Sequence, residues 1–185
     1  MLTPYSPIVY ATPANSITAR VYCDLVKDAL SEYAYDAEVA GLEYSVSVSS
    51  VGIEVELSGY NDKMSVLLEK VLHKMKDLEI SEDRFKVIKE RNLRAYRNWI
   101  YQQPYHQVGE YTRYLNTQLV WMHSDILPEL EELTSDDVRN LHPKLFRTIH
   151  VEALVHGNLY KEVSDTACKN SSALKLTFSG CAQIR

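Results

Sequence analysis

The sequence lacks long hydrophobic runs and any concentration of positive charge. Nowhere do about 18 apolar residues follow one another, which excludes a conventional membrane-spanning helix. Acidic residues outnumber basic ones, 25 to 20, and the lysines and arginines form no face for phosphate backbones. The opening MLTPYSPIVY also lacks the charged and apolar regions of a signal peptide. We therefore expect a cytoplasmic protein with neither a membrane nor a nucleic acid as partner.

Cysteine and glycine are scarce as well. The three cysteines, Cys23, Cys168 and Cys181, lie far apart without C-x-x-C spacing, as in a reducing compartment. We interpret them as structurally neutral thiols. The six glycines form neither a phosphate-binding loop nor the G-x-S-x-G turn of a hydrolase.

The histidines form no complete zinc motif. Zinc peptidases need H-E-x-x-H or H-x-x-E-H on a helix, because this spacing places both imidazoles on one face beside a carboxylate, and neither motif occurs. The segment HVEALVHGNL contains the H-x-E of nucleobase deaminases, but their P-C-x-x-C does not follow. As a strand it would place apolar side chains on one face and a mixed set on the other, the latter being His150, Glu152, Leu154 and His156.

A second histidine pair lies on a predicted helix. His106 and Glu110 are four residues apart, but no third ligand is identifiable, and zinc takes about three or four. A solvated surface pair is the better interpretation. The isolated His73, His123 and His142 are interpreted as surface or capping residues. The residues alone therefore give no catalytic, cofactor-binding or metal-ligating position.

Apolar periodicity and alternation predict the first elements. A helix should run from about Ile17, with Asn15 or Ser16 as its cap and Gly41 as its stop. Strict alternation over 42–57 then predicts a two-stranded hairpin with one buried face.

More helices follow the hairpin. One contains Leu67–Met75, one starts at Ser81, one has Pro104 as its first residue, and one starts at Thr134 and breaks near Pro143. In the helices from Ser81 and Pro104 we expect these residues to face inward: Phe85, Ile88, Tyr96 and Trp99, then Tyr105, Val108, Tyr111, Leu115, Leu119 and Met122.

The order of these elements indicates the fold class. A last strand over 149–156 follows the helices, so the chain reads strand, helix, hairpin, helices, strand. This order favours an α+β fold in which helices cover a mostly antiparallel sheet. The 185 residues, 45% hydrophobic and 24% charged, suit one globular domain. The polar residues 163–185 indicate a tail with little fixed structure.

Six segments of the chain are informative when they are taken together: SPIVYATPAN, LVKDALSEYAYDAEVAGLEYSV, LSGYNDKMSVLLEKVL, RFKVIKE, QQPYHQV and HVEALVHGNL. In this order they resemble the third domain of the insulysin group within the pitrilysin-insulysin family of inverted-motif zinc metallopeptidases. The resemblance covers roughly residues 6–160. It assigns residues 1–162 to an insulysin-like domain and leaves 163–185 as a divergent tail.

The resemblance implies a division of labour between domains. Members of this family have four similar α+β domains that enclose a chamber, and zinc is bound by H-x-x-E-H and a distal glutamate of the first. The matching helix here, with Val21–Lys27, has no histidine, so no catalytic residue is carried over. In the family, further strands precede the point that matches Ser6. We therefore expect part of the sheet to be missing, with an open edge where the outer strand is lost.

Three functions remain to be compared. The resemblance favours a non-catalytic chamber or scaffold part of a peptide-degrading metalloendopeptidase, with peptides or a homologous peptidase half as partners and no cofactor of its own. The alternative is a stand-alone pseudo-peptidase that binds peptides or a peptidase. An independent zinc hydrolase would need ligands that the sequence does not show. An open sheet edge and uncovered apolar surface also predict that the isolated chain forms a homo-oligomer.

Overall fold

The computed structural model describes residues 1–49, 52–118, 120–147, 150–157 and 183–184. Its elements confirm the α+β class with a mostly antiparallel sheet. In chain order they are β1 (Leu2–Tyr5), the 3-10 helix η1 (Pro7–Tyr10), α1 (Pro13–Val39), β2 (Leu42–Val48), β3 (Ile53–Gly59), α2 (Asn61–Lys76), α3 (Glu82–Asn98), the 3-10 helix η2 (Trp99–Tyr101), α4 (Pro104–Asn116), α5 (His123–Glu132), α6 (Ser135–Leu145), β4 (His150–Val155) and β5 (Gln183–Ile184). Among the described residues, no helix is long and apolar enough to cross a membrane.

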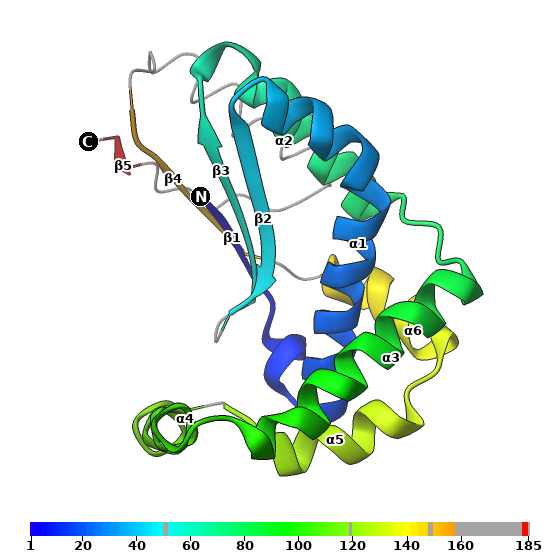
Figure 1. The fold of residues 1–185 in the computed structure, drawn as a ribbon. Helices are drawn as coiled ribbons and strands as arrows, with labels where there is room; N and C mark the ends of the chain where they lie inside the picture. The colour runs from blue at the N-terminus through cyan, green and yellow to red at the C-terminus, as the bar shows by residue number, and fades with distance from the viewer. Residues whose placement is uncertain (50–51, 119, 148–149, 158–182, 185) are drawn as a thin grey trace.

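The five strands form one sheet in the order β2-β3-β1-β4-β5 (Figure 1). All neighbours are antiparallel except β4 and β5, which are parallel. Strand β1 lies inside the sheet, with Leu2 opposite Val55 of β3 on one side and Ala153 of β4 on the other. The start of the chain therefore forms no edge of the described sheet, because β1 has a neighbour on each side. In the described sheet, β2 is one outer strand.

The hairpin of β2 and β3 is confirmed by its register. Val46 lies opposite Val55, and Val48 lies opposite Ile53. Val46, Val55 and Ile53 are buried, while the residues between them point to the other face of the sheet. This alternation arises because successive side chains of a strand point to opposite faces.

Helix α1 is longer at its start than periodicity alone predicts. It begins at Pro13, and the side chain of Thr12 caps it by accepting a hydrogen bond from the Asn15 amide at 3.1 Å. The predicted caps, Asn15 and Ser16, were wrong because the favourable Thr12-Pro13 pair lies outside the apolar pattern. The predicted stop is confirmed: Gly41, just after the helix, has a φ of 74°.

The core lies between the sheet and its helices. Figure 1 shows α1 and α2 against one face of the sheet, and α3, α5 and α6 around the far side of α1. The α1 residues Val21 and Val26, the sheet residues Val46 and Val55, and Val71 of α2 are fully buried. Burial of such side chains stabilises the fold by roughly 1.5–3 kcal/mol each, which ties the two layers together.

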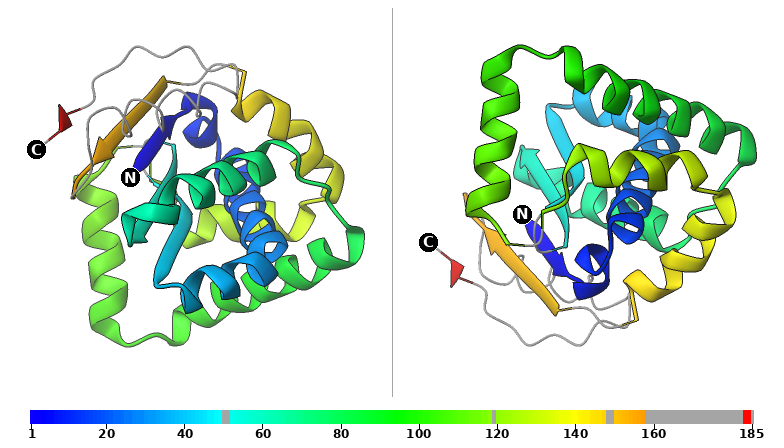
Figure 2. Two further views of the ribbon diagram at one scale, coloured as in Figure 1. Left: turned by 90° about the horizontal axis from the view of Figure 1, so that it is seen from above. Right: turned by 90° about the horizontal axis from the view of Figure 1, so that it is seen from below.

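Helix α3 follows the prediction, whereas α4 does not. Phe85, Ile88 and Tyr96 are buried, but Trp99 is only half-buried and lies in η2. Helix α4 begins at Pro104 as predicted. The side chains of α4 that were expected to face inward are exposed, because α4 runs beside the body of the molecule rather than across it (Figure 2). The exposed ones are Tyr105, Val108, Tyr111 and Leu115.

The region after α4 contains a helix that the sequence did not reveal. Leu119 lies outside the described residues, and Met122 precedes α5 instead of ending α4. Pro128 lies inside α5 and weakens the sequence signal for this helix, because proline lacks an amide donor. The Asp125 carboxylate compensates at the start of α5 by accepting a hydrogen bond from the Met122 amide at 3.1 Å.

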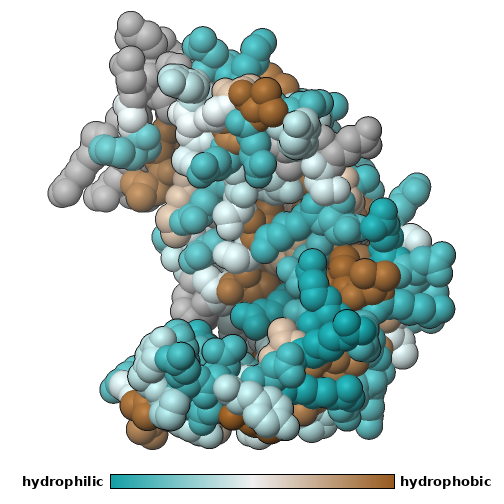
Figure 3. Space-filling model, in the orientation of Figure 1, coloured by the Kyte–Doolittle hydropathy of each residue, from teal (hydrophilic) through white to brown (hydrophobic). Residues whose placement is uncertain are grey.

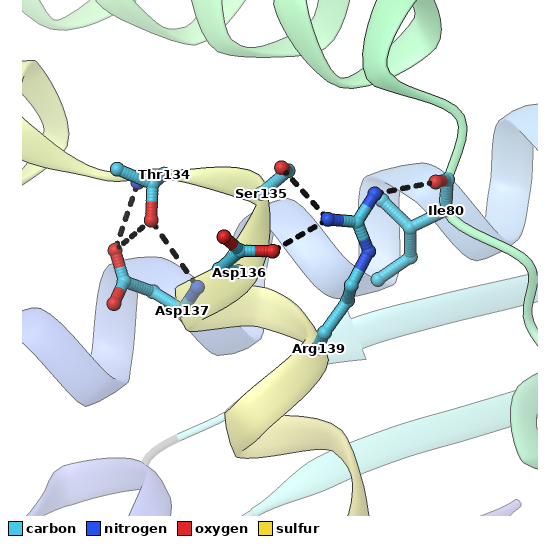
Figure 4. Close-up of polar contacts among 6 residues, drawn as sticks. All are labelled: Ile80, Thr134, Ser135, Asp136, Asp137 and Arg139. Atoms are coloured by element: carbon cyan, nitrogen blue, oxygen red, sulfur yellow. Dashed lines mark hydrogen bonds and ion pairs between the residues drawn. The ribbon is translucent and has the colours of Figure 1, made fainter.

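The predicted start of α6 is confirmed in detail (Figure 4). The Asp137 amide donates to the Thr134 hydroxyl at 3.3 Å, and the Thr134 amide donates to the Asp137 carboxylate at 2.9 Å. Arg139 links this turn to the loop before α3 by donating to the Ile80 carbonyl at 3.1 Å. The helix continues past Pro143 to Leu145.

Candidate functional site

The face of the sheet that points away from α1 and α2 is polar and acidic. We call it the open face and define it by Tyr5, Glu43, Glu54, Glu56, His150 and Glu152. The registers place these residues on one side, since Tyr5 lies opposite His150 and Ser45 opposite Glu56. Strands β1 to β4 contain no lysine or arginine. The open face is therefore negatively charged at neutral pH.

The histidine of the HVEALVHGNL segment takes part in a small cluster on the open face. The Tyr5 hydroxyl donates to the Glu152 carboxylate at 3.0 Å, and this carboxylate lies 3.6 Å from His150 Nε2. The rings of Tyr5 and His150 are 5.8 Å apart. The hydrogen bond to Glu152 raises the pKa of Tyr5, so the phenol stays protonated and donates.

These residues do not fit a zinc ion. Tyr5 already occupies one oxygen of Glu152, and His156 lies beyond the end of β4. On α4, Glu110 pairs with Arg113 at 2.9 Å rather than turning toward His106. Within the described ranges, no group of three histidine, cysteine, aspartate or glutamate side chains could hold a metal ion.

A small cavity lies where α4 meets η2 and the start of α5. It has a volume of about 60 Å³. We call it the aromatic pocket and define it by Trp99, Glu110, Tyr111, Tyr114, Trp121 and His123. Both tryptophans of the chain line it.

Ring contacts hold the walls of the aromatic pocket together. His123 stacks on Trp99, with ring centroids 4.5 Å apart and planes 13° apart, and Tyr111 meets Trp99 edge-on at 5.8 Å. The ring of Tyr96 also lies against His123, with the ring centroids 5.0 Å apart. The Tyr96 hydroxyl accepts a hydrogen bond from Arg20 of α1 at 2.8 Å. Burial lowers the pKa of His123, only partly opposed by Glu110, so its ring is neutral at neutral pH.

One residue that lines the aromatic pocket has a polar atom without a partner. The indole Nε1 of Trp121 is buried and donates no hydrogen bond to any described residue. Glu110, the charged residue of the wall, is held by Arg113. A buried donor without an acceptor is costly, so such groups usually meet a water or a ligand.

Helix α1 matches the helix that, by the resemblance, carries the zinc motif in a catalytic domain. In this chain α1 packs in the core. Tyr22 and Cys23 of α1 are buried. Burial raises the pKa of Cys23 to about 12, which leaves an unreactive thiol and agrees with its interpretation as structurally neutral. Asp24 accepts a hydrogen bond from Asn92 at 2.9 Å and pairs with Arg91 at 3.3 Å, which joins α1 to α3. Cys168 and Cys181 lie outside the described residues.

The sequence did not reveal the aromatic pocket. His123 was interpreted as an isolated surface or capping residue, which is wrong because it packs between Trp99 and Tyr96. His142 does act as a cap, since its Nε2 lies 2.9 Å from the Met75 carbonyl near the end of α2. The available signal was that both tryptophans lie within a short stretch of chain beside a histidine.

Comparison with known proteins assigns the chain to a family. Residues 1–129 match the sequence profile described as the middle or third domain of peptidase M16. The chain belongs to the M16 peptidase family. It is 38% identical to human insulin-degrading enzyme over 160 residues, which cover 86% of this chain and 16% of the human enzyme. It is 36% identical over 173 residues to the Drosophila melanogaster insulin-degrading enzyme, covering 93% of this chain and 18% of that protein.

Solved structures agree with this M16 assignment at the level of the fold. The crystal structure of pitrilysin matches with a TM-score of 0.84 and 17% identity, over 96% of this chain and 19% of that one. A predicted insulinase family protease from Yersinia pestis matches with a TM-score of 0.66 and 11% identity, over 94% of this chain and 42% of that one. The chain therefore spans less than a fifth of the insulin-degrading enzymes named above.

Proposed function

We infer that this M16 chain is a non-catalytic chamber or scaffold part of a peptide-degrading zinc metalloendopeptidase. The observation that carries the proposal is the match of residues 1–129 to the middle or third domain of the family. The relatives that are named insulin-degrading enzymes suggest peptides as substrates. A homologous peptidase half is the expected partner, and the cytoplasm is the expected location.

The packing of this chain supports a location of the zinc chemistry in a different part of such an enzyme. Zinc would supply an activated water for peptide hydrolysis when bound. In this chain, the α1 segment from Val21 to Lys27 packs in the core and binds α3 through Asp24. We therefore derive no catalytic step from these residues. Their contribution is to hold the sheet and its open face in a fixed position.

The exposed surfaces of the chain support a scaffold role. Tyr105, Val108 and Leu115 of α4 are 64%, 61% and 81% exposed, which is unusual for apolar side chains on a helix. Figure 3 shows brown, hydrophobic side chains on the lower left lobe, where α4 lies in Figure 1. Apolar surface of this kind commonly marks contact with another domain or protein.

Complementation of a divided enzyme tests the proposal. Human insulin-degrading enzyme lacking the segment that matches this chain is mixed with the purified chain, and cleavage of a fluorogenic peptide is followed. We expect no cleavage by either part alone and zinc-dependent cleavage by the mixture. Cleavage by the chain alone, with one tightly bound zinc per molecule, would overturn the proposal in favour of an independent hydrolase.

Two matched valine variants control this experiment. Val46→Asp places a charge at a fully buried position of β2 and should abolish complementation by unfolding the domain. Val39→Asp makes the same substitution at the end of α1, where the side chain is 74% exposed, and should complement like the natural chain. If the chain binds the intact enzyme and changes its rate, yet never complements the divided one, the pseudo-peptidase alternative replaces the proposal.

A further inference from the structure

We propose that strand β2 accepts an extended peptide as a further, antiparallel strand, and that this peptide carries lysine or arginine at alternate positions. That the added strand is a peptide rests on the function proposed above. Two independent observations carry the inference. In the described sheet β2 is paired on one side only (Figure 1), and the open face beside it is negatively charged.

The backbone of β2 points alternately toward β3 and away from it. The register between the two strands runs along β2 without a bulge, and just beyond it the Ser49 amide donates to the Gly52 carbonyl at 2.8 Å. In an antiparallel pair, residues that exchange such bonds alternate with residues that do not. Tyr44 and Val46 therefore direct their amides and carbonyls to the outer side of β2, where the described sheet has no further strand.

Strand β2 also lacks the features by which outer strands usually avoid such pairing. Natural outer strands are very short, carry lysine or proline, or contain a bulge. The sequence of β2, LEYSVSV, has seven residues without lysine or proline, and its pairing with β3 is regular. An extended chain can therefore form main-chain hydrogen bonds along β2, as in peptide complexes that form by strand addition.

The register of the hairpin determines the charge of the added strand. On the open face, Ser45 and Ser47 of β2 lie opposite Glu56 and Glu54 of β3. Neighbouring strands are about 4.8 Å apart, so each glutamate lies two strand spacings from the added strand. Because serine is short, the long stem of a lysine or arginine can extend across it toward the glutamate. Strands β1 to β4 supply no lysine or arginine of their own.

The alternate positions of the added strand meet apolar side chains. They lie beside Tyr44, which is half-buried, and Val46, which is fully buried. Valine suits these positions, because pairs of β-branched and aromatic residues across two strands are favourable. The β2 strand of a second copy fits less well, since it brings no cation to the glutamates of β3. The chemistry of the surface therefore selects a peptide in which basic residues and valine alternate.

Hydrogen exchange followed by NMR tests this register. The probe is the acetylated and amidated peptide Val-Lys-Val-Lys-Val, which in antiparallel pairing places its central valine opposite Val46 and its lysines opposite Ser45 and Ser47. We expect the probe to slow exchange of the Tyr44 and Val46 amides in a saturable manner. The amides of Ser45 and Ser47 already point toward β3 and should change much less.

Methylation of the probe separates strand addition from simple attraction of charges. The nitrogen of the central valine faces β2 in this register, so a methyl group on it should abolish binding. The nitrogen of either lysine faces away from β2, so a methyl group there should leave binding nearly unchanged. Both methylated probes carry the same charge, and a difference between them therefore reports the main-chain hydrogen bonds.

Variants of the chain test the role of charge. Glu54→Gln and Glu56→Gln should each weaken binding about two- to fivefold, and Glu79→Gln, at an exposed position in the loop after α2, should have no effect. The double variant Glu54→Lys, Glu56→Lys should bind the peptide Val-Glu-Val-Glu-Val instead. Ser45→Lys, at an exposed position of β2, should abolish binding of the lysine probe, with the circular dichroism spectrum unchanged.

Four results would overturn this inference. Three are exchange of the Tyr44 and Val46 amides that the probe does not slow, equal binding of the two methylated probes, and equal binding by the glutamine variants. The fourth is protection of these amides in the free chain that increases with its concentration, which would assign β2 to a second copy. A chain that complements the divided enzyme but does not bind the probe defeats this inference alone. A chain that binds the probe but does not complement defeats the scaffold function alone.

Discussion

The phenol of Tyr10 satisfies both backbone groups of Gly52. Its hydroxyl donates to the Gly52 carbonyl at 3.1 Å and accepts from the Gly52 amide at 3.0 Å. Burial raises the pKa of Tyr10 to about 12, so the hydroxyl keeps its proton at neutral pH and can donate. One side chain of η1 thereby fixes the backbone of Gly52, the residue directly before strand β3.

Removing this hydroxyl should destabilise the fold. Tyr10→Phe leaves the buried Gly52 amide without an acceptor, whereas the Gly52 carbonyl still accepts from the Ser49 amide at 2.8 Å. We expect a loss of about 1–3 kcal/mol in the free energy of unfolding, measured in urea. The control Tyr35→Phe, at a side chain that is 69% exposed, should change stability by less than about 0.5 kcal/mol. Equal losses for the two variants would refute the prediction.

Two glycine substitutions should act in opposite directions. A Cβ at Gly52 would lie 2.0 Å from the Pro4 carbonyl oxygen, so β1 would have to move away from the hairpin. Gly52→Ala should therefore destabilise by more than about 2 kcal/mol. A Cβ at Gly109 of α4 meets nothing within 4 Å, and alanine favours a helix. Gly109→Ala should stabilise by about 0.5–1 kcal/mol, as thermal or urea unfolding would show.

The cap of α6 should make part of the stability depend on pH. Two hydrogen bonds lower the pKa of Asp137. The bond from the Thr134 side chain has the larger effect, and the bond from the Thr134 amide has the smaller one. Because the folded-state pKa lies below the ordinary 3.8, the contribution is fully present above that value. It is lost as the pH falls through the lower folded-state pKa. The stability difference between the natural chain and Asp137→Asn should therefore disappear in acid.

Measuring unfolding in urea across this pH range tests the cap. Thr134→Ala should cost about 0.5–2 kcal/mol at neutral pH. Asp136→Asn is the matched control, since Asp136 lies in the same turn but pairs with Arg139 rather than with Thr134 (Figure 4). If Asp136→Asn and Asp137→Asn show the same loss at every pH, the helix dipole rather than the cap accounts for both.

The sequence predicted those elements whose signals are local. The hairpin follows from strict alternation, and the start of α6 follows from Thr134 and Asp137 at capping distance. The exposure of the apolar stripe on α4 could not be predicted. Periodicity reveals an apolar stripe but does not show whether another part of the molecule covers it. The aromatic pocket depends on tertiary packing, since η2, α4 and α5 bring Trp99, Tyr111 and His123 together.

The uncovered stripe of α4 leads to a prediction about association. Val108 and Leu115, with Tyr105 nearby, are exposed along one side of this helix. Two copies that pack these stripes against each other would remove apolar surface from water. A two-fold dimer suits this contact, because both copies then use the same stripe. We therefore expect the isolated chain to be a dimer at micromolar concentration.

Light scattering coupled to size-exclusion chromatography tests this prediction. The natural chain should elute with a mass near twice its 21.2 kDa, and the double variant Val108→Ser, Leu115→Ser should elute as a monomer with an unchanged circular dichroism spectrum. Val39→Ser is the control: Val39 is 74% exposed but lies at the end of α1, away from the stripe, so this variant should remain dimeric. A monomeric natural chain would reject association. A dimer that survives the double variant would locate the contact elsewhere, and the outer strand β2 would then be the next surface to alter, because an unpaired strand edge can pair with a second copy.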